Sequence, residues 1–236
     1  MKVKYIYIFV FFLIFPDRLI FSAATIFNKN FQNEYQLAIK TYESRQSEIQ
    51  FFANEYGIDP DIISAVIFPE IMRYSYLKDK AEISALYSLY ILFGSEFSNY
   101  SVGMFQMKPS FIERLEEEIK QYPDLERLFL INEFPENISE NNLKSIRVKR
   151  MINEEWQVKY LISFIKIMER NFSSYLSKIE DQKEIVRFYS TAYNTGIFKD
   201  KKKINRFINK KFYNTNHGLY NYSDISLYFY QNYIKK

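Results

Sequence analysis

Glu70 is the residue in this chain whose type and position best suit it for chemistry. It follows an apolar run over residues 62–69 that only Ser64 interrupts. On a helix, Ile63, Val66, Ile67 and Glu70 would share one face, which should point inward. Burial raises the pKa of a carboxyl group because it disfavours the charged form, and a raised pKa suits a general acid near neutral pH. We therefore predict that Glu70 is a catalytic acid.

The same carboxylate also has a simpler structural interpretation. Arg73 lies three residues further on, at a spacing that brings two side chains together on a helix. Glu70 would then be the buried half of an ion pair, which a charge in the interior requires as a partner. Glu70 alone does not decide between catalysis and ion pairing.

Two further segments carry polar side chains at unusual places. Gln106 lies between apolar residues in a glycine-bearing loop, and a buried amide needs hydrogen-bond partners, which a backbone carbonyl or a ligand would supply. Tyr193 and Asn194 end a helical stretch, and Gly196 suits the left-handed residue that often closes a helix. The loop reads GMFQMKP over residues 103–109, and the turn reads AYNTG over residues 192–196.

The composition excludes several other mechanisms. The chain has no cysteine and one histidine, His217, so a thiol nucleophile is excluded and a structural zinc site nearly so. A Ser-His-Asp triad would have to use that histidine, which lies in a polar, turn-like stretch. Neither a P-loop nor a G-x-G-x-x-G motif occurs. We expect no metal and no organic cofactor.

The elements that must position these residues are predicted to be helices. Apolar spacing and capping residues indicate helices at 31–56, from 60 to about 68, at 79–93, 110–120, 153–175, 181–193 and 223–233. Pro69 predicts a kink or a last turn around Phe68. Residues 97–109 are predicted to be extended or hairpin-like. The expected fold is all-α, with at most a small β-hairpin.

The first 24 residues have the pattern of an export signal. Two lysines precede an apolar stretch, and small residues at 22–24 fit a cleavage site, although retention as an anchor is the alternative. Cleavage would lower the net charge from +4 to about +2, which does not favour nucleic-acid binding. We predict one domain over residues 25–236 and an exported protein, periplasmic or associated with the cell envelope.

Together the three segments resemble the soluble lytic transglycosylase domain, a lysozyme-like family that cleaves peptidoglycan. The family has a glutamate that ends an apolar helix, then a Gly-x-x-Gln-x-x-Pro loop, then an Ala-Tyr-Asn-x-Gly turn. The resemblance covers about residues 51–196, with the motifs in the same order. It implies a lysozyme-like helical fold with an extra helix, at 79–93, inserted between the first two motifs.

The resemblance also implies roles for individual residues. Glu70 would be the catalytic acid and then the base, with Met104 and Gln106 lining the sugar cleft. Tyr193 would place its hydroxyl near the Glu70 carboxyl or the substrate acetamido group. Asn194 would also bind the substrate and, with Gly196, hold the turn. Supporting roles fall to Gly196, to Gly103, and to Ser75 or Tyr74, which would replace the serine that the family has where this chain has Ile71.

The implied reaction cuts the bond between N-acetylmuramic acid and N-acetylglucosamine and leaves 1,6-anhydro ends. The partner would be the peptidoglycan glycan strand, and the sequence does not show whether an envelope or secretion apparatus also binds. One alternative is a hydrolytic muramidase, in which Glu82 or Glu96 would face Glu70 across about 6.5–9.5 Å and activate water. The other is a non-catalytic peptidoglycan-binding or scaffold protein. The inserted helix is expected to form one wall of the cleft.

Overall fold

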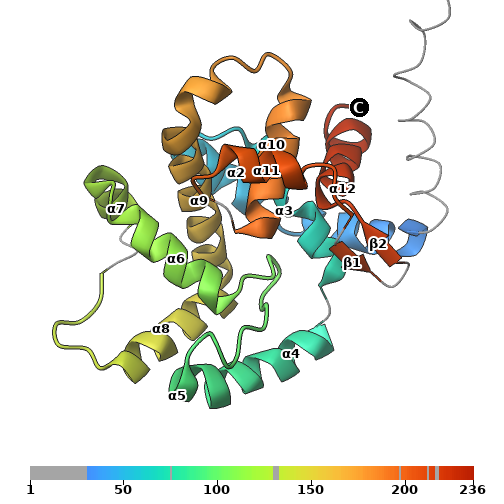
Figure 1. Cartoon of the computed structure of the whole chain (residues 1–236). Helices are drawn as coiled ribbons and strands as arrows, with labels where there is room; N and C mark the ends of the chain where they lie inside the picture. The colour runs from blue at the N-terminus through green and yellow to red at the C-terminus, as the bar shows by residue number, and fades with distance from the viewer. Residues whose placement is uncertain (1–30, 75, 130–132, 197, 212, 216–217) are drawn as a thin grey trace, which may run out of the picture.

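The computed structural model describes residues 31–74, 76–129, 133–196, 198–211, 213–215 and 218–236, and these are mostly helical (Figure 1). The all-α prediction is therefore confirmed. The export signal predicted for residues 1–24, as well as Ser75 and His217, lies outside the described residues. The helical segments are residues 31–43, α2 (Gln46–Glu55), α3 (Pro60–Arg73), α4 (Tyr76–Ala85), η1 (Leu86–Tyr90), α5 (Ile91–Phe93), α6 (Pro109–Ile119), α7 (Pro123–Phe129), α8 (Glu140–Ile152), α9 (Glu154–Leu176), α10 (Gln182–Thr195), α11 (Lys201–Phe207), α12 (Tyr222–Phe229) and η2 (Tyr230–Ile234).

Helix α3, which carries Glu70, begins as its sequence predicts. The Asp59 side chain accepts a hydrogen bond from the Asp61 amide, and Pro60 occupies the first helical turn, where its missing N–H costs nothing. The predicted end near Phe68 is wrong, because the helix continues past Pro69 to Arg73. Every residue from 62 to 71 is buried, so packing on both sides of Pro69 outweighs the hydrogen bond that proline cannot donate.

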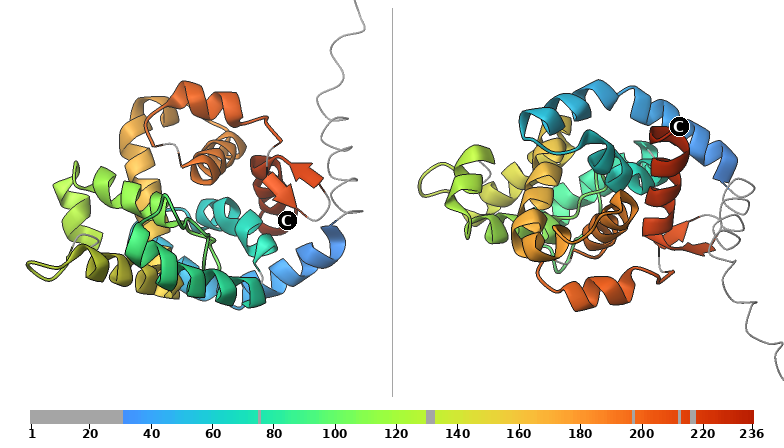
Figure 2. Two further views of the ribbon diagram at one scale, coloured as in Figure 1. Left: turned by 60° about the horizontal axis from the view of Figure 1, so that its bottom comes forward. Right: turned by 90° about the horizontal axis from the view of Figure 1, so that it is seen from above.

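Helix α3 lies at the centre of the molecule. It packs against α2, α10 and α12, which surround it in Figure 2. The Phe68 ring stacks on Phe229 of α12 at 3.8 Å between centroids, and the Tyr222 hydroxyl donates to the Val66 carbonyl at 2.9 Å. Glu70 is thus held on the most enclosed helix of the core.

The helix predicted at 79–93 is present and longer. Residues 76–93, which we call the inserted segment, run through α4, the π-helical η1 and α5, and end at Gly94 with φ of 86°. The segment packs on α8, and the Tyr90 hydroxyl donates to Glu113 of α6 at 2.9 Å.

Two small β elements interrupt the helices. Strands β1 (Tyr213–Thr215) and β2 (Gly218–Tyr220) pair antiparallel just before α12, in keeping with the expected small hairpin. The loop before α6 contains an antiparallel bridge between Val102 and Met107, which fits the hairpin-like segment predicted at 97–109.

In the described part of the chain, no helix combines the length and apolar character that crossing a membrane requires.

Candidate active site

Glu70 lies on a cleft of about 370 Å³ into which all three sequence motifs converge. The C-terminal end of α3 contributes Glu70, the loop before α6 contributes Gln106, and the end of α10 contributes Tyr193, Asn194 and Gly196. These segments are far apart in the sequence, so the fold alone brings them together. Further lining residues that the sequence did not single out are Asn99, Met107, Lys108, Ser110, Phe111, Arg114 and Thr195.

The Glu70 side chain is 7% exposed, and its Oε2 lies 3.9 Å from Nε of Arg73. The ion pair predicted as the alternative therefore forms, but Arg73 also lines the cleft. A charge-assisted hydrogen bond between these groups would measure about 2.7–2.9 Å. The longer separation keeps the positive charge close to the carboxyl without a tight hydrogen bond between this pair of atoms.

Ile71, which stands where the resembled family has serine, points into the core. It is buried with the apolar residues of α3 and does not line the cleft. Arg73 is the polar neighbour that the structure places beside the Glu70 carboxyl.

The loop at residues 103–106 is held by side chains from three helices. Asp79 of α4 accepts a hydrogen bond from the Gly103 amide at 2.7 Å. Gln157 of α9 accepts one from the Phe105 amide at 2.8 Å. The Tyr193 hydroxyl of α10 donates to the Phe105 carbonyl at 2.8 Å. The loop conformation is thus fixed from several sides.

Gly103 is required at its position by both backbone and space. Its φ is 75°, in the left-handed region, and a Cβ atom there would lie 2.4 Å from the Gln157 amide nitrogen. Because glycine has no side chain, Gln157 can approach the loop closely enough to accept a hydrogen bond from the Phe105 amide.

Gln106 lines the cleft, and its amide is satisfied within the loop. Its Nε2 donates to the Gly103 carbonyl at 2.9 Å, and its Oε1 accepts from the Ser101 hydroxyl at 3.3 Å. From the sequence, the hydrogen-bond partner of this amide could be a backbone carbonyl or a ligand. The structure shows that the amide nitrogen binds a backbone carbonyl. Met104, predicted to contact the sugar, is buried and does not line the cleft, whereas Met107 does.

Tyr193 and Asn194 present different groups to the cleft. Burial, followed by the negative charge of Glu70, holds the pKa of Tyr193 well above its ordinary value, so the hydroxyl stays protonated. The Nδ2 atom of Asn194 is buried and has no hydrogen-bond partner among the described residues. It is a donor available to a ligand in the cleft. Gly196, with φ of 61°, closes α10, and its carbonyl accepts from Arg114 at 2.9 Å.

The cleft has a basic character. Among the described residues that line it, Glu70 is the one acid, beside Arg73, Lys108 and Arg114. Neither Glu82 nor Glu96 lines it. Residues 79–93 of the inserted segment are not among the described lining residues, so the expected role of the 79–93 helix as a wall is wrong; it supports the loop through Asp79 instead.

The described ranges contain no group of three or more histidine, cysteine, aspartate or glutamate side chains that could hold a metal ion. Arg114 was not singled out from the sequence, although its spacing could have indicated a place in the cleft. It lies three and four residues after Phe111 and Ser110, on one face of a helix that directly follows the glutamine loop.

Asp79→Asn is expected to change the pH dependence of stability. Burial raises the Asp79 pKa above 3.8, against the lowering by the Gly103 amide. Because the folded pKa is the higher one, ionisation costs the folded state stability as pH rises from about 4 through the folded pKa. The asparagine retains an oxygen acceptor and cannot ionise. The melting temperature of the variant should rise relative to that of wild type as pH increases above about 4 and through the folded pKa of Asp79, and the difference should then stay constant. A constant difference at every pH would contradict this.

Tyr193→Phe is expected to destabilise the protein by about 1–3 kcal/mol, because it leaves the buried Phe105 carbonyl without its donor. Urea unfolding would measure the change. Tyr189→Phe is the matched control, since Tyr189 is also buried on α10 and its hydroxyl makes no hydrogen bond to another described residue. Equal losses in the two variants would show that the bond to the loop contributes nothing.

Comparison with protein-family models, with curated proteins and with solved structures finds no match for this chain. The order of the sequence motifs and the geometry of the cleft are therefore the features that indicate a function.

Proposed function

We propose that this protein is a peptidoglycan lytic transglycosylase that cleaves the bond between N-acetylmuramic acid and N-acetylglucosamine. The observation that carries the proposal is the convergence of three separate motifs on one cleft, with Glu70 at the end of a buried apolar helix. A buried carboxyl group beside a cleft is the arrangement that general acid catalysis requires. The proposal includes a lysozyme-like fold and action in the cell envelope after export.

The proposed reaction needs one carboxyl group. Glu70 gives its proton to the glycosidic oxygen as the bond to C1 of the muramic acid breaks. The acetamido oxygen of the same sugar attacks C1, so the substrate supplies the nucleophile. The Glu70 carboxylate then takes the proton from the C6 hydroxyl, whose oxygen displaces the acetamido oxygen at C1. The product is a 1,6-anhydro ring, and Glu70 ends protonated, ready for another cycle.

The neighbours of Glu70 fit both halves of this cycle. Burial favours the protonated acid, whereas the Arg73 charge 3.9 Å away stabilises the carboxylate that acts as base. The Asn194 amide is a buried donor in the cleft, suited to an acetamido carbonyl oxygen. The three basic lining residues suit a glycan that carries carboxylates on its lactyl groups or peptides.

The presence of a single acidic residue among the described lining residues of the cleft favours the transglycosylase over the inverting hydrolase. An inverting enzyme holds a second carboxylate about 6.5–9.5 Å from the acid to activate water. Glu82 and Glu96 are absent from the lining, and Glu70 is the one acid among the described lining residues.

The test is an analysis of the products released from purified peptidoglycan by the chain from residue 25 onward. Mass spectrometry of the released muropeptides should find anhydro ends, which are lighter than reducing ends by one water. Reducing ends would instead identify a hydrolase. If no fragments are released while the protein still sediments with peptidoglycan, the binding and scaffold alternative holds and the proposal fails.

A further inference from the structure

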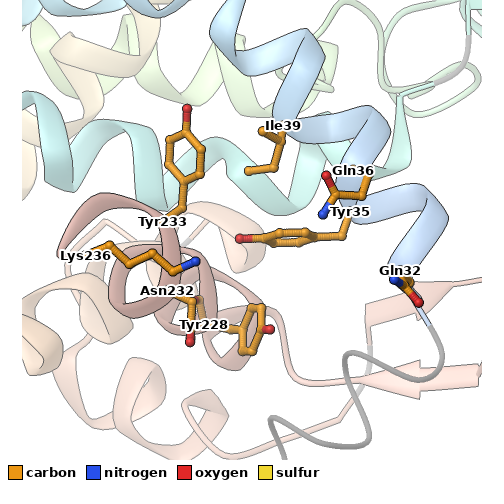
Figure 3. A pocket seen from close by; sticks show the side chains of 8 residues that line it. All are labelled: Gln32, Tyr35, Gln36, Ile39, Tyr228, Asn232, Tyr233 and Lys236. Atoms are coloured by element: carbon orange, nitrogen blue, oxygen red, sulfur yellow. The ribbon is translucent and has the colours of Figure 1, made fainter.

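A second hollow lies between the helix at residues 31–43 and the C-terminal helices (Figure 3), and it shares no described lining residue with the Glu70 cleft. Its volume is about 530 Å³, within the range of about 300–1,000 Å³ typical of small-molecule sites. It is bounded by the helix at residues 31–43 and by α12 with η2. Tyr35 of this hollow packs on Phe68 at 5.3 Å between ring centroids. Tyr35 thus connects the hollow to the core around α3, although no residue of α3 is among its described lining residues.

The walls of this hollow are aromatic and amide-rich. Three tyrosines and three carboxamide side chains line it, together with one aliphatic residue and one lysine, Lys236. The aromatic and amide residues are Gln32, Tyr35, Gln36, Tyr228, Asn232 and Tyr233. No acidic side chain is among the described lining residues.

Packing fixes the tyrosine walls. Tyr35 and Tyr228 meet edge to face at 5.5 Å. The Tyr233 hydroxyl donates to Glu43 at 2.9 Å, and the Asn232 amide nitrogen donates to the Tyr228 carbonyl at 2.9 Å. Figure 3 shows the Tyr35 side chain reaching from its helix toward η2, across the open space. The helix at residues 31–43, α12 and η2 thus hold the tyrosine rings and the Asn232 amide around one volume.

This chemistry selects one class of ligand. Carboxamides offer both donors and acceptors, which match an acetamido group and neighbouring hydroxyls. Tyrosine rings offer flat apolar faces with a polar edge, which suit the two-sided surface of a sugar. A phosphate ligand would need several cations, whereas this site has a single lysine. An apolar ligand would leave the hydrogen-bonding capacity of the Gln32 and Gln36 side chains unused.

We propose that this hollow is a second saccharide site, which takes a neutral N-acetylated sugar and is separate from the Glu70 cleft. Its occupancy does not depend on cleavage by Glu70. With both sites filled, the protein would hold a sugar between the helix at residues 31–43 and α12 with η2, while the Glu70 cleft holds another part of the glycan.

The probe is N,N′,N″-triacetylchitotriose, titrated by calorimetry into the chain from residue 25 onward with Glu70→Gln in place, so that no sugar is cut. Adding Gln36→Ala and Tyr228→Phe together should weaken binding at one site by about tenfold, since each removes a polar group facing the ligand. Leu37→Ala is the matched control, because Leu37 is the exposed neighbour of Gln36 and does not line the hollow. Circular dichroism and melting curves would check that each variant is folded.

The outcomes separate this site from the cleft. Binding that survives Gln36→Ala with Tyr228→Phe but is lost on Asn194→Ala would place the sugar in the cleft alone and overturn the second site, while leaving the proposed function standing. Absence of binding, or equal binding of maltotriose, which has no acetamido groups, would also overturn it. Absence of peptidoglycan cleavage by the chain with Glu70 intact, while the second site still binds the sugar, would instead contradict the transglycosylase.

Discussion

Glu70→Gln is expected to reduce the release of muropeptides by about 10³-fold or more, because one residue acts as acid and then as base. The glutamine has nearly the same shape and leaves the buried position filled, but it can neither give nor accept the required proton. The rate would be measured from soluble fragments released over time from labelled peptidoglycan. Binding to insoluble peptidoglycan should persist, since the remaining cleft residues are unchanged.

A matched control is available in Glu118→Gln. Glu118 is another glutamate of low exposure, paired with Lys199 at 2.7 Å, and it does not line the cleft. Its variant should cleave at the wild-type rate. If Glu70→Gln retained full activity, or if both variants lost it equally, Glu70 would not be the catalytic residue and the proposed mechanism would fail.

Gly103→Ala is expected to destabilise the protein by about 2–4 kcal/mol. The left-handed φ of 75° costs an alanine about 1–2 kcal/mol. The new methyl group would also displace the Gln157 side chain, and losing a buried hydrogen bond to the Phe105 amide costs about 1–3 kcal/mol. Chemical denaturation would measure the change. Activity should fall as well, since the same loop presents Gln106 to the cleft.

Two comparisons isolate the steric part of this effect. Gly57 has a similar φ of 63°, but a Cβ there would meet nothing within 4 Å, so Gly57→Ala should cost only the backbone strain. In Gly103→Ala combined with Gln157→Ala, the clash is gone, so the combined loss should be smaller than the sum of the two single losses. Equal costs for Gly57→Ala and Gly103→Ala would contradict a steric role for Gln157.

The sequence predicts the helices best where local chemistry marks their ends. Three helices are capped as predicted, by Asp59, Asn153 and Asp181. A side-chain oxygen that accepts from the first amides of a helix involves only residues close together in the sequence, so the sequence reveals it. The end of α3 could not be predicted in this way. Its last turn is stabilised by burial of Phe68 and Ile71 against distant segments, a tertiary effect that overrides the local effect of Pro69.

The motif residues of the candidate site could be predicted in part. Glu70, Gln106, Tyr193 and Asn194 all line one cleft, since the motif order reflects the order in which the fold brings them together. Arg73 could be placed beside Glu70 from its spacing on the helix. The face of α6 marked Arg114 as a candidate, but its position in the cleft follows from its tertiary contact with the Gly196 carbonyl, which no local pattern specifies. The role of the inserted segment was mistaken for a similar reason. It supports the glutamine loop through the buried hydrogen bond that Asp79 accepts from the Gly103 amide, which spacing in the sequence does not reveal.

The continuous burial of residues 62–71 also governs how the site responds to heat. In many enzymes the catalytic residues lie on weakly held loops, which open before the rest of the structure does. Glu70 instead belongs to the central helix, whose displacement would require the core formed with α10 and α12 to come apart. The carboxyl group should therefore keep its orientation up to the melting temperature. Loss of activity on heating and loss of the fold are expected to be one cooperative event.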